Sequence, residues 1–112
     1  MVKRKIGIYK NYFWDFYYKQ SPKVQLKIDW TIDLIRTTRI VPKKYFKKLK
    51  DAGDLWEIRV SANNGIYRIL CFFDDENLII LTTGFQKKTS KIPKSEIIKA
   101  IKIKKEYYEN KR

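Results

Sequence analysis

The sequence predicts an α+β domain in which a small antiparallel β-sheet meander carries two N-terminal helices and a C-terminal helix. Three observations predict this class. A proline-led amphipathic segment indicates an early helix, apolar and polar residues alternate from Leu55 onwards, and a second amphipathic segment lies near the end of the chain. The length of 112 residues suits a single domain, expected to span residues 1–112.

The N-terminal region contains one predicted strand and one ambiguous segment. Residues 5–9 alternate weakly between apolar and polar side chains, which predicts a short strand. Residues 12–18 form an aromatic run that either extends this strand or begins a helix, because periodicity does not separate the two over so short a segment.

Two helices are expected next. Ser21 and Pro22 are typical of a helix start, since serine caps the first turn and proline fits its first position. Apolar side chains then recur at helical spacing and predict an amphipathic helix over roughly 22–38. Pro42 predicts the start of a second short helix. The apolar side of that helix would consist of Tyr45, Phe46 and Leu49.

The second half of the chain changes to a period of two, which is typical of half-buried strands. Residues rich in Asn, Gly and Asp between the apolar runs predict tight turns, so the strands form an antiparallel meander. The expected strands are Leu55–Ser61, Ile66–Phe73 and Leu78–Phe85.

A last helix is expected over residues 95–110, after the break at Pro93 and with Ser95 as its candidate cap. Its inner side would hold Ile97, Ala100, Ile101, Ile103 or Lys104, and Tyr107 or Tyr108.

The formal net charge of +14 exceeds what solubility requires of a domain of this size. Residues 1–50 hold 14 lysines or arginines and 3 acidic residues, against 12 and 9 in residues 51–112. A positive field of this strength favours polyanions such as nucleic acid, an anionic membrane or an acidic protein. The alternative is a lysine-rich proteome that places lysine on every surface.

The residue types that the sequence lacks exclude several kinds of catalytic, metal and disulfide site. The chain has no histidine and a single cysteine, so a histidine base, ordinary zinc sites and an intramolecular disulfide are excluded. Cys71 lies in an apolar run and is expected to be a buried thiol rather than a nucleophile. No phosphate-binding loop, signal peptide or membrane span is apparent, so we expect a cytoplasmic protein without cofactor, metal or membrane partner.

Two arginines are expected to share one face of the sheet. If residues 63–64 form a two-residue turn, or residues 62–65 a four-residue loop, Arg59 pairs directly with Arg68. A turn at residues 64–65 shifts the register by two positions and keeps both arginines on one face, whereas a three-residue loop separates them.

Paired arginines repel each other by a few tenths to about 1 kcal/mol, so an anion is expected beside them. Glu57, on the same face of its strand, is the internal candidate. A phosphate is the external candidate, because the guanidinium fork matches phosphate oxygens. A salt-bridged sheet face without any ligand is the alternative.

The next hairpin is expected to bring further cations to this face. A tight turn places Arg68 opposite Thr83, with Phe85 and Lys87 on the same face and Lys88 pointing the other way. Tyr67 and Phe85 are candidate stacking surfaces for bases, although core packing is the commoner role of each aromatic alone.

Five short strings occur in order along the chain: Leu55–Arg59, Tyr67–Leu70, Gly84–Thr89, Ile92-Pro93 and Glu96–Ala100. Together they resemble the RelE/ParE toxin superfamily and, within it, the HigB-like phage-derived branch of type II toxin–antitoxin toxins. The resemblance runs from about Lys47 to Tyr108, with a weaker match over the N-terminal aromatics and the first helix.

The resemblance implies a RelE-like, microbial ribonuclease-like fold and ribosome-dependent cleavage of mRNA, which inhibits translation and arrests growth. It implies a metal-independent endoribonuclease in which the RNA 2′-OH attacks the adjacent phosphate. The implied partners are the ribosome, mRNA and a cognate antitoxin, HigA-like and with a helix-turn-helix domain.

Site residues are also implied by the resemblance. Arg59 matches the arginine of a Glu-x-Arg strand, and Arg68 matches the arginine that contacts the scissile phosphate. Lys87 and Lys88 match a Phe-x-Lys-Lys pair. Tyr107 or Tyr108 matches an aromatic residue of the C-terminal helix. The RNA-binding residues expected around this catalytic set are Lys43, Lys44, Lys47, Lys48, Glu57 and Phe85.

Such cleavage needs a base for the 2′-OH, cations for the charged transition state and a proton for the leaving 5′ oxygen. The arginines suit the charge role. A lysine, Glu57 or a tyrosine is left as the base, because the chain lacks the histidine that some HigB-type toxins use.

Two other functions stay open at this point. One is a non-nucleolytic toxin directed at DNA gyrase, as in the ParE branch of the superfamily. The other is a plain basic module that binds nucleic acid through its charge and without toxicity.

Overall fold

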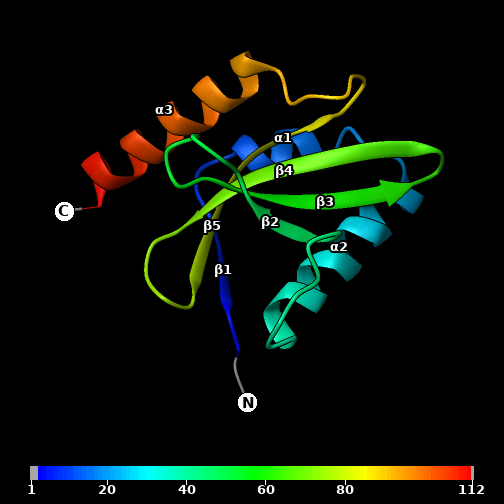
Figure 1. Ribbon diagram of the computed structural model, residues 1–112, viewed down its shortest axis with the longest axis horizontal. Coiled ribbons are helices and arrows are strands. Elements are labelled where there is room, and N and C mark those ends of the chain that lie inside the picture. Colours follow the sequence, from blue (N-terminus) through cyan, green and yellow to red (C-terminus); the bar gives the residue numbers. More distant parts are fainter. Residues whose placement is uncertain (1–2, 112) are drawn as a thin grey trace.

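The computed structural model describes residues 3–111 and confirms the α+β class, with a five-stranded mixed sheet packed between helices (Figure 1). The spatial order of the strands is β1-β5-β4-β3-β2. In chain order the elements are β1 (Lys5–Ile8), α1 (Tyr12–Tyr17), α2 (Pro22–Thr37), β2 (Phe46–Lys48), β3 (Trp56–Ala62), β4 (Gly65–Phe73), β5 (Leu78–Gln86) and α3 (Lys94–Asn110).

Helices cover both faces of the sheet. The main core lies between the sheet and the pair α1 and α2, and it contains the buried thiol of Cys71, whose pKa is raised by burial. On the other face, Ala100 of α3 packs with Leu70 and Phe72 of β4. Figure 1 shows the β3–β4 hairpin extending beyond α3. The hairpin end of this second face therefore projects past the helix.

The helix predicted after Ser21 is confirmed as α2. The Ser21 hydroxyl accepts a hydrogen bond from the Val24 amide at 3.4 Å, and Pro22 occupies the first helical position. The buried stripe of α2 consists of Val24, Ile28, Thr31 and Ile35.

The ambiguous aromatic run at residues 12–18 is the helix α1. Its buried side chains are Phe13 and Phe16. Phe16 lies so close to Gly84 of β5 that a Cβ atom at that position would come within 2.5 Å of the Phe16 ring. The glycine therefore sets how closely α1 approaches the sheet.

Gly84→Ala is expected to lower the free energy of unfolding by about 1–3 kcal/mol, because the added methyl overpacks a filled core. Urea denaturation measures this change. Adding Phe16→Leu to the same chain should recover part of the loss. Unchanged stability of the single variant would mean that α1 is displaced from the sheet at no cost.

The short helix predicted after Pro42 is wrong. Residues 43–45 form a turn, and Phe46–Lys48 form the edge strand β2, antiparallel to β3. Phe46 packs in the core under α1 and α2, whereas Leu49 packs in the core on the α3 side. Because these side chains lie on opposite faces of the sheet, one helix side could not bury both, and the hydrogen bonds to β3 override the local pattern.

The sheet is also not purely an antiparallel meander. The first strand, expected at residues 5–9, is β1, and it pairs in parallel with β5, for example Ile6 with Ile79. The other neighbouring strands are antiparallel. The N-terminal strand thus becomes one edge of the sheet, and β2 becomes the other edge.

Residues 63–64 form a two-residue turn between β3 and β4, which is one of the turns that the sequence allowed. Asn63 and Asn64 have φ angles of 51° and 63°, as a type I′ turn requires, and the pairs on either side include Arg59 with Arg68. The expectation that the two arginines share one face is confirmed, and of the registers left open the structure has the one that pairs them directly.

The predicted register between β4 and β5 is wrong by two residues. Arg68 lies opposite Phe85 rather than Thr83. One residue of the shift comes from a longer turn, since Phe73 pairs with Ile79, and the other comes from a bulge opposite Leu70. The Thr82 hydroxyl fills this bulge by donating a 2.6 Å hydrogen bond to the Leu70 carbonyl. Beyond the bulge the shift is two, so residues 84–86 keep their predicted faces relative to Arg68, whereas residues 79–81, shifted by one, lie on the face opposite to the predicted one.

The C-terminal helix begins at Lys94, and Ser95 is not its cap. Pro93 is the N-cap residue, and it offers no side-chain cap hydrogen bond. On the predicted inner side, Ala100 and Ile103 are buried, whereas Ile101 is 40% exposed and was wrongly included. None of the helices among residues 3–111 is long and apolar enough to cross a membrane.

Candidate functional site

The side of the sheet that α3 covers carries a group of charged residues toward the hairpin end. The register places Lys47 opposite Glu57, and Arg59 opposite Arg68. Lys87 follows β5, where its amide donates a 2.7 Å hydrogen bond to the Ile66 carbonyl and continues the pairing with β4. Strand alternation puts all these side chains on one face. We call this surface the basic face and define it by Lys47, Glu57, Arg59, Arg68 and Lys87.

A buried ion pair lies at the centre of the basic face. Nε of Arg68 lies 2.8 Å from Oε1 of Glu57, and the two residues are 4% and 6% exposed. The Nε–H of Arg68 makes no well-aligned hydrogen bond within the part of the chain that the structure describes. Nη1 of Arg68 donates to the Tyr67 carbonyl at 3.1 Å. The pair is thus held by charge and by one backbone contact.

Three influences act on the Arg68 guanidinium. Burial lowers its pKa, the Glu57 carboxylate opposes that shift, and the neighbouring Arg59 adds to it. Glu57 is therefore the internal anion predicted from the paired arginines, and it neutralises one of the two cations.

Arg59 is the more accessible of the two arginines. It is half-buried, and its Nη1 donates a long 3.4 Å hydrogen bond to the Lys43 carbonyl. Its own amide donates to the Tyr45 carbonyl at 2.8 Å, which fixes the turn before β2 beside it. Among residues 3–111 no carboxylate lies within ion-pair distance of Arg59. The guanidinium can therefore take an external anion.

The remaining predicted lysines divide between the basic face and its surroundings. Lys47 is exposed and lies on the face, whereas Lys48 points to the other side and forms a 3.3 Å ion pair with Asp54. Lys88 is exposed and lies in the segment after the end of β5. Lys43 and Lys44 lie in the turn beside Arg59.

Tyr107 lies away from the basic face. Its hydroxyl donates a 2.7 Å hydrogen bond to Asp74, and its ring packs on Phe72, four residues along β4 from Arg68. Four residues of strand span roughly 13 Å. Burial, together with Asp74, raises the pKa of Tyr107 to about 12. The structure thus places this tyrosine in the docking of α3 and not beside the arginines.

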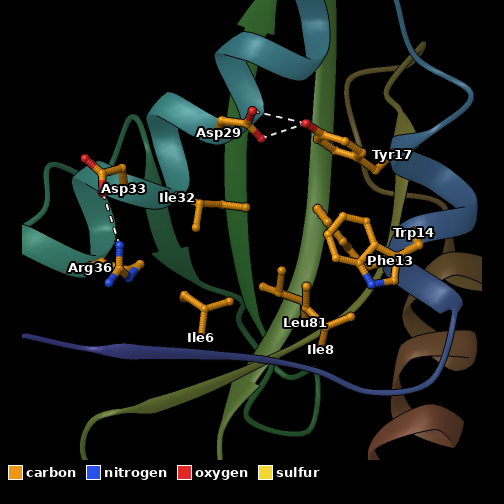
Figure 2. A pocket seen from close by; sticks show the side chains of 10 residues that line it. All are labelled: Ile6, Ile8, Phe13, Trp14, Tyr17, Asp29, Ile32, Asp33, Arg36 and Leu81. Atoms are coloured by element: carbon orange, nitrogen blue, oxygen red, sulfur yellow. Dashed lines mark hydrogen bonds and ion pairs between the residues drawn. The ribbon is translucent and has the colours of Figure 1, made fainter.

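A separate apolar hollow lies on the opposite side of the sheet, between α1, α2 and β1 (Figure 2). Its rim includes Asp29, which accepts a hydrogen bond from the Tyr17 hydroxyl at 2.9 Å, and Asp33, which pairs with Arg36 at 3.2 Å. Each charged side chain of this rim thus already has a polar partner within it. The residues lining the hollow are Ile6, Ile8, Phe13, Trp14, Tyr17, Asp29, Ile32, Asp33, Arg36 and Leu81.

Within the described residues, no group of three or more acidic or cysteine side chains is arranged to hold a metal ion.

The placement of Lys47 beside Glu57 was missed from the sequence, because residues 42–49 were predicted as a helix. Alternation around Phe46–Lys48 was the available signal, but it covers only three residues.

The fold and the basic face define a small α+β domain whose sheet carries two paired arginines, Arg59 and Arg68, on one face. The chain belongs to the phage-derived protein Gp49-like family (DUF891), whose model matches residues 15–105. This is a toxin-like family related to the RelE/ParE toxins, and membership implies an antitoxin partner in general. No curated protein matches the sequence.

Proposed function

We propose that the protein is the toxin of a type II toxin–antitoxin system and that it is a HigB-like endoribonuclease cleaving mRNA on the ribosome. The observation that carries this proposal is the pairing of Arg59 with Arg68 on the basic face of a chain from a toxin-like family. Adjacent guanidinium groups suit a phosphate whose charge increases during the reaction.

In the proposed reaction, the 2′-oxygen of one nucleotide attacks the adjacent phosphorus and the bond to the 5′ oxygen breaks. Arg59 contacts the phosphate oxygens directly, because its guanidinium is accessible and lacks a carboxylate partner in the described chain. Arg68 does not contact the phosphate directly and acts as a fixed, buried positive charge on the central strand β4. The ribosome contributes by holding the mRNA in a reactive geometry.

The proton transfers fall to other members of the basic face. Glu57 is the acidic residue of the basic face, and its carboxylate is the candidate acceptor for the 2′-OH proton. The ammonium groups of Lys47 and Lys87 are candidates for donating the proton that the leaving 5′ oxygen takes up. Tyr107 has no part in this scheme, because it lies at the α3 docking site and its pKa is raised to about 12.

The proposed partners follow from the same class. They are the ribosome with its mRNA, and a HigA-like antitoxin with a helix-turn-helix domain that blocks the toxin in the cytoplasm. The net charge of +14 supports binding to an RNA-rich particle, since it attracts polyanions over distances set by the salt concentration.

A gyrase-directed toxin is the second candidate. The burial of Arg68 against Glu57 favours it, because an arginine that is already paired has less need of a phosphate. A toxin of this kind would leave mRNA intact and damage DNA.

Induced expression in bacteria, followed by mapping of RNA 5′ ends and a DNA-damage reporter, separates the two candidates. We expect growth arrest with new cleavage sites inside translated mRNA and a silent reporter. Growth arrest with intact mRNA and an active reporter would overturn the proposal in favour of the gyrase-directed toxin. Unimpaired growth with intact mRNA would overturn both.

A further inference from the structure

An aromatic and cationic patch lies beside Arg59, at the edge of the basic face. Trp30 of α2 is 48% exposed, and its ring meets that of Tyr45 with centroids 5.4 Å apart and planes at 69°. The Lys27 ammonium lies over the Trp30 ring, 4.4 Å from its centroid, and the Lys44 ammonium lies 5.0 Å from the Tyr45 ring. We call Lys27, Trp30, Lys44 and Tyr45 the tryptophan patch.

The tryptophan patch is physically continuous with the proposed site. The Tyr45 carbonyl accepts the hydrogen bond from the Arg59 amide, and the Lys43 carbonyl accepts from the Arg59 side chain. The turn at residues 43–45 therefore connects the exposed ring of Trp30 with the accessible guanidinium of Arg59. A strand whose phosphate lies at Arg59 would pass over this turn.

The chemistry of the tryptophan patch suits single-stranded RNA. Surfaces that bind single strands without strong sequence preference combine a cationic track for the phosphates with aromatic rings on which bases stack. The two ammonium groups beside the rings would lose their hydration under an apolar partner, whereas adjoining phosphates would pair with them. The patch also lies in the half of the chain that holds 14 lysines or arginines against 3 acidic residues.

We propose that the tryptophan patch is a base-stacking subsite for a nucleotide flanking the one that Arg59 contacts. A base stacks on the Trp30 indole, while Lys27 and Lys44 contact the adjoining phosphates. This inference rests on the proposed function for the choice of RNA as the ligand, and it adds a binding element on α2 and the turn before β2.

The test is the affinity of a 2′-O-methyl single-stranded oligonucleotide, which cannot be cleaved, and of a matched oligonucleotide with abasic positions. Trp30→Leu is expected to weaken binding of the base-bearing strand by about 5- to 100-fold, since stacking on one aromatic is worth about 1–3 kcal/mol. Trp30→Phe keeps a stacking ring and should stay much closer to the unaltered protein. The abasic strand should bind Trp30→Leu and the unaltered protein equally.

Leu26→Ala is the matched control, because Leu26 is 68% exposed on the same helix one turn away and outside the patch. It should leave RNA binding unchanged. Equal affinities of Trp30→Leu and the unaltered protein for the base-bearing strand would overturn the inference. So would an equal loss for the base-bearing and abasic strands. If Trp30→Leu fails to fold in thermal melting, equal binding of both strands by the unaltered protein overturns it.

Failure of the proposed function would look different. It would appear as intact mRNA with the unaltered protein, whatever the affinities of the variants. If Trp30→Leu and Leu26→Ala both weaken binding of the antitoxin and neither changes RNA binding, the surface docks a protein and the stacking subsite is wrong.

Discussion

Arg59→Ala is expected to reduce mRNA cleavage by about 100- to 1,000-fold, the loss typical of removing one preorganised donor to a charged transition state. Arg59 is the accessible arginine of the basic face, with one long hydrogen bond to a backbone carbonyl. Its removal leaves no buried charge behind, so the fold should persist. Primer extension on a translated mRNA measures the cleavage, and thermal melting checks the fold.

Arg36→Ala is the matched control for this experiment. Arg36 is an accessible arginine too, but it lies on α2 at the rim of the apolar hollow and pairs with Asp33 (Figure 2). It should cleave like the unaltered protein. If both arginine variants lose activity equally, the effect is one of total charge, and the assignment of Arg59 to the phosphate is wrong.

Arg68→Met is expected to lower the free energy of unfolding by about 3–5 kcal/mol, because it strands the Glu57 carboxylate in the sheet without a counter-charge. Both side chains are less than a tenth exposed, so water cannot replace the missing partner. Urea denaturation at neutral pH measures the change. In the double variant Glu57→Gln with Arg68→Met, the stranded charge is gone and most of the loss should be recovered.

The exposed ion pair between Lys48 and Asp54 provides the contrast. Its side chains are 54% and 80% exposed, so Lys48→Met should change stability by less than about 1 kcal/mol. If Arg68→Met is as mild as Lys48→Met, the Glu57 charge is solvated and the buried pair does not hold the centre of the basic face together. In that case Arg68 would be free to contact RNA.

The arginine pair was predictable from the sequence because it depends on local chemistry. Asn63 and Asn64 tolerate the positive φ angles of a type I′ turn, and a two-residue turn fixes the register for the whole hairpin. The start of α2 was predictable for a similar reason, since Ser21 and Pro22 define a helix terminus within one turn.

The missed features depend on contacts far along the chain. Tyr45, Phe46 and Leu49 match a helix in spacing, and only the presence of β3 alongside turns that segment into an edge strand. The parallel pairing of β1 with β5 joins residues more than seventy positions apart, which no local pattern encodes. The bulge opposite Leu70, where the Thr82 hydroxyl donates to the Leu70 carbonyl, follows no pattern in the local sequence.

The shared face of Arg68, Phe85 and Lys87 was nevertheless predicted, because a register error of an even number of residues leaves side chains on the same side of a sheet. The register error between β4 and β5 was two residues, so Phe85 and Lys87 stayed on the face of Arg68. An error of one residue would have moved them to the side of the sheet covered by α1 and α2. Tyr107 illustrates the opposite case, because its place was inferred from resemblance and its docking to Asp74 depends on how α3 crosses the sheet.

The most direct measurement of the central claim is cleavage of a defined mRNA in a reconstituted translation system, with and without ribosomes. The account predicts that the unaltered protein cuts within the translated region only when ribosomes are present, leaving a 2′,3′-cyclic phosphate and a 5′-hydroxyl. It predicts that Arg59→Ala cuts the same mRNA about 100- to 1,000-fold more slowly. Intact mRNA with the unaltered protein on translating ribosomes would contradict it, and so would equal cutting by the Arg59→Ala variant.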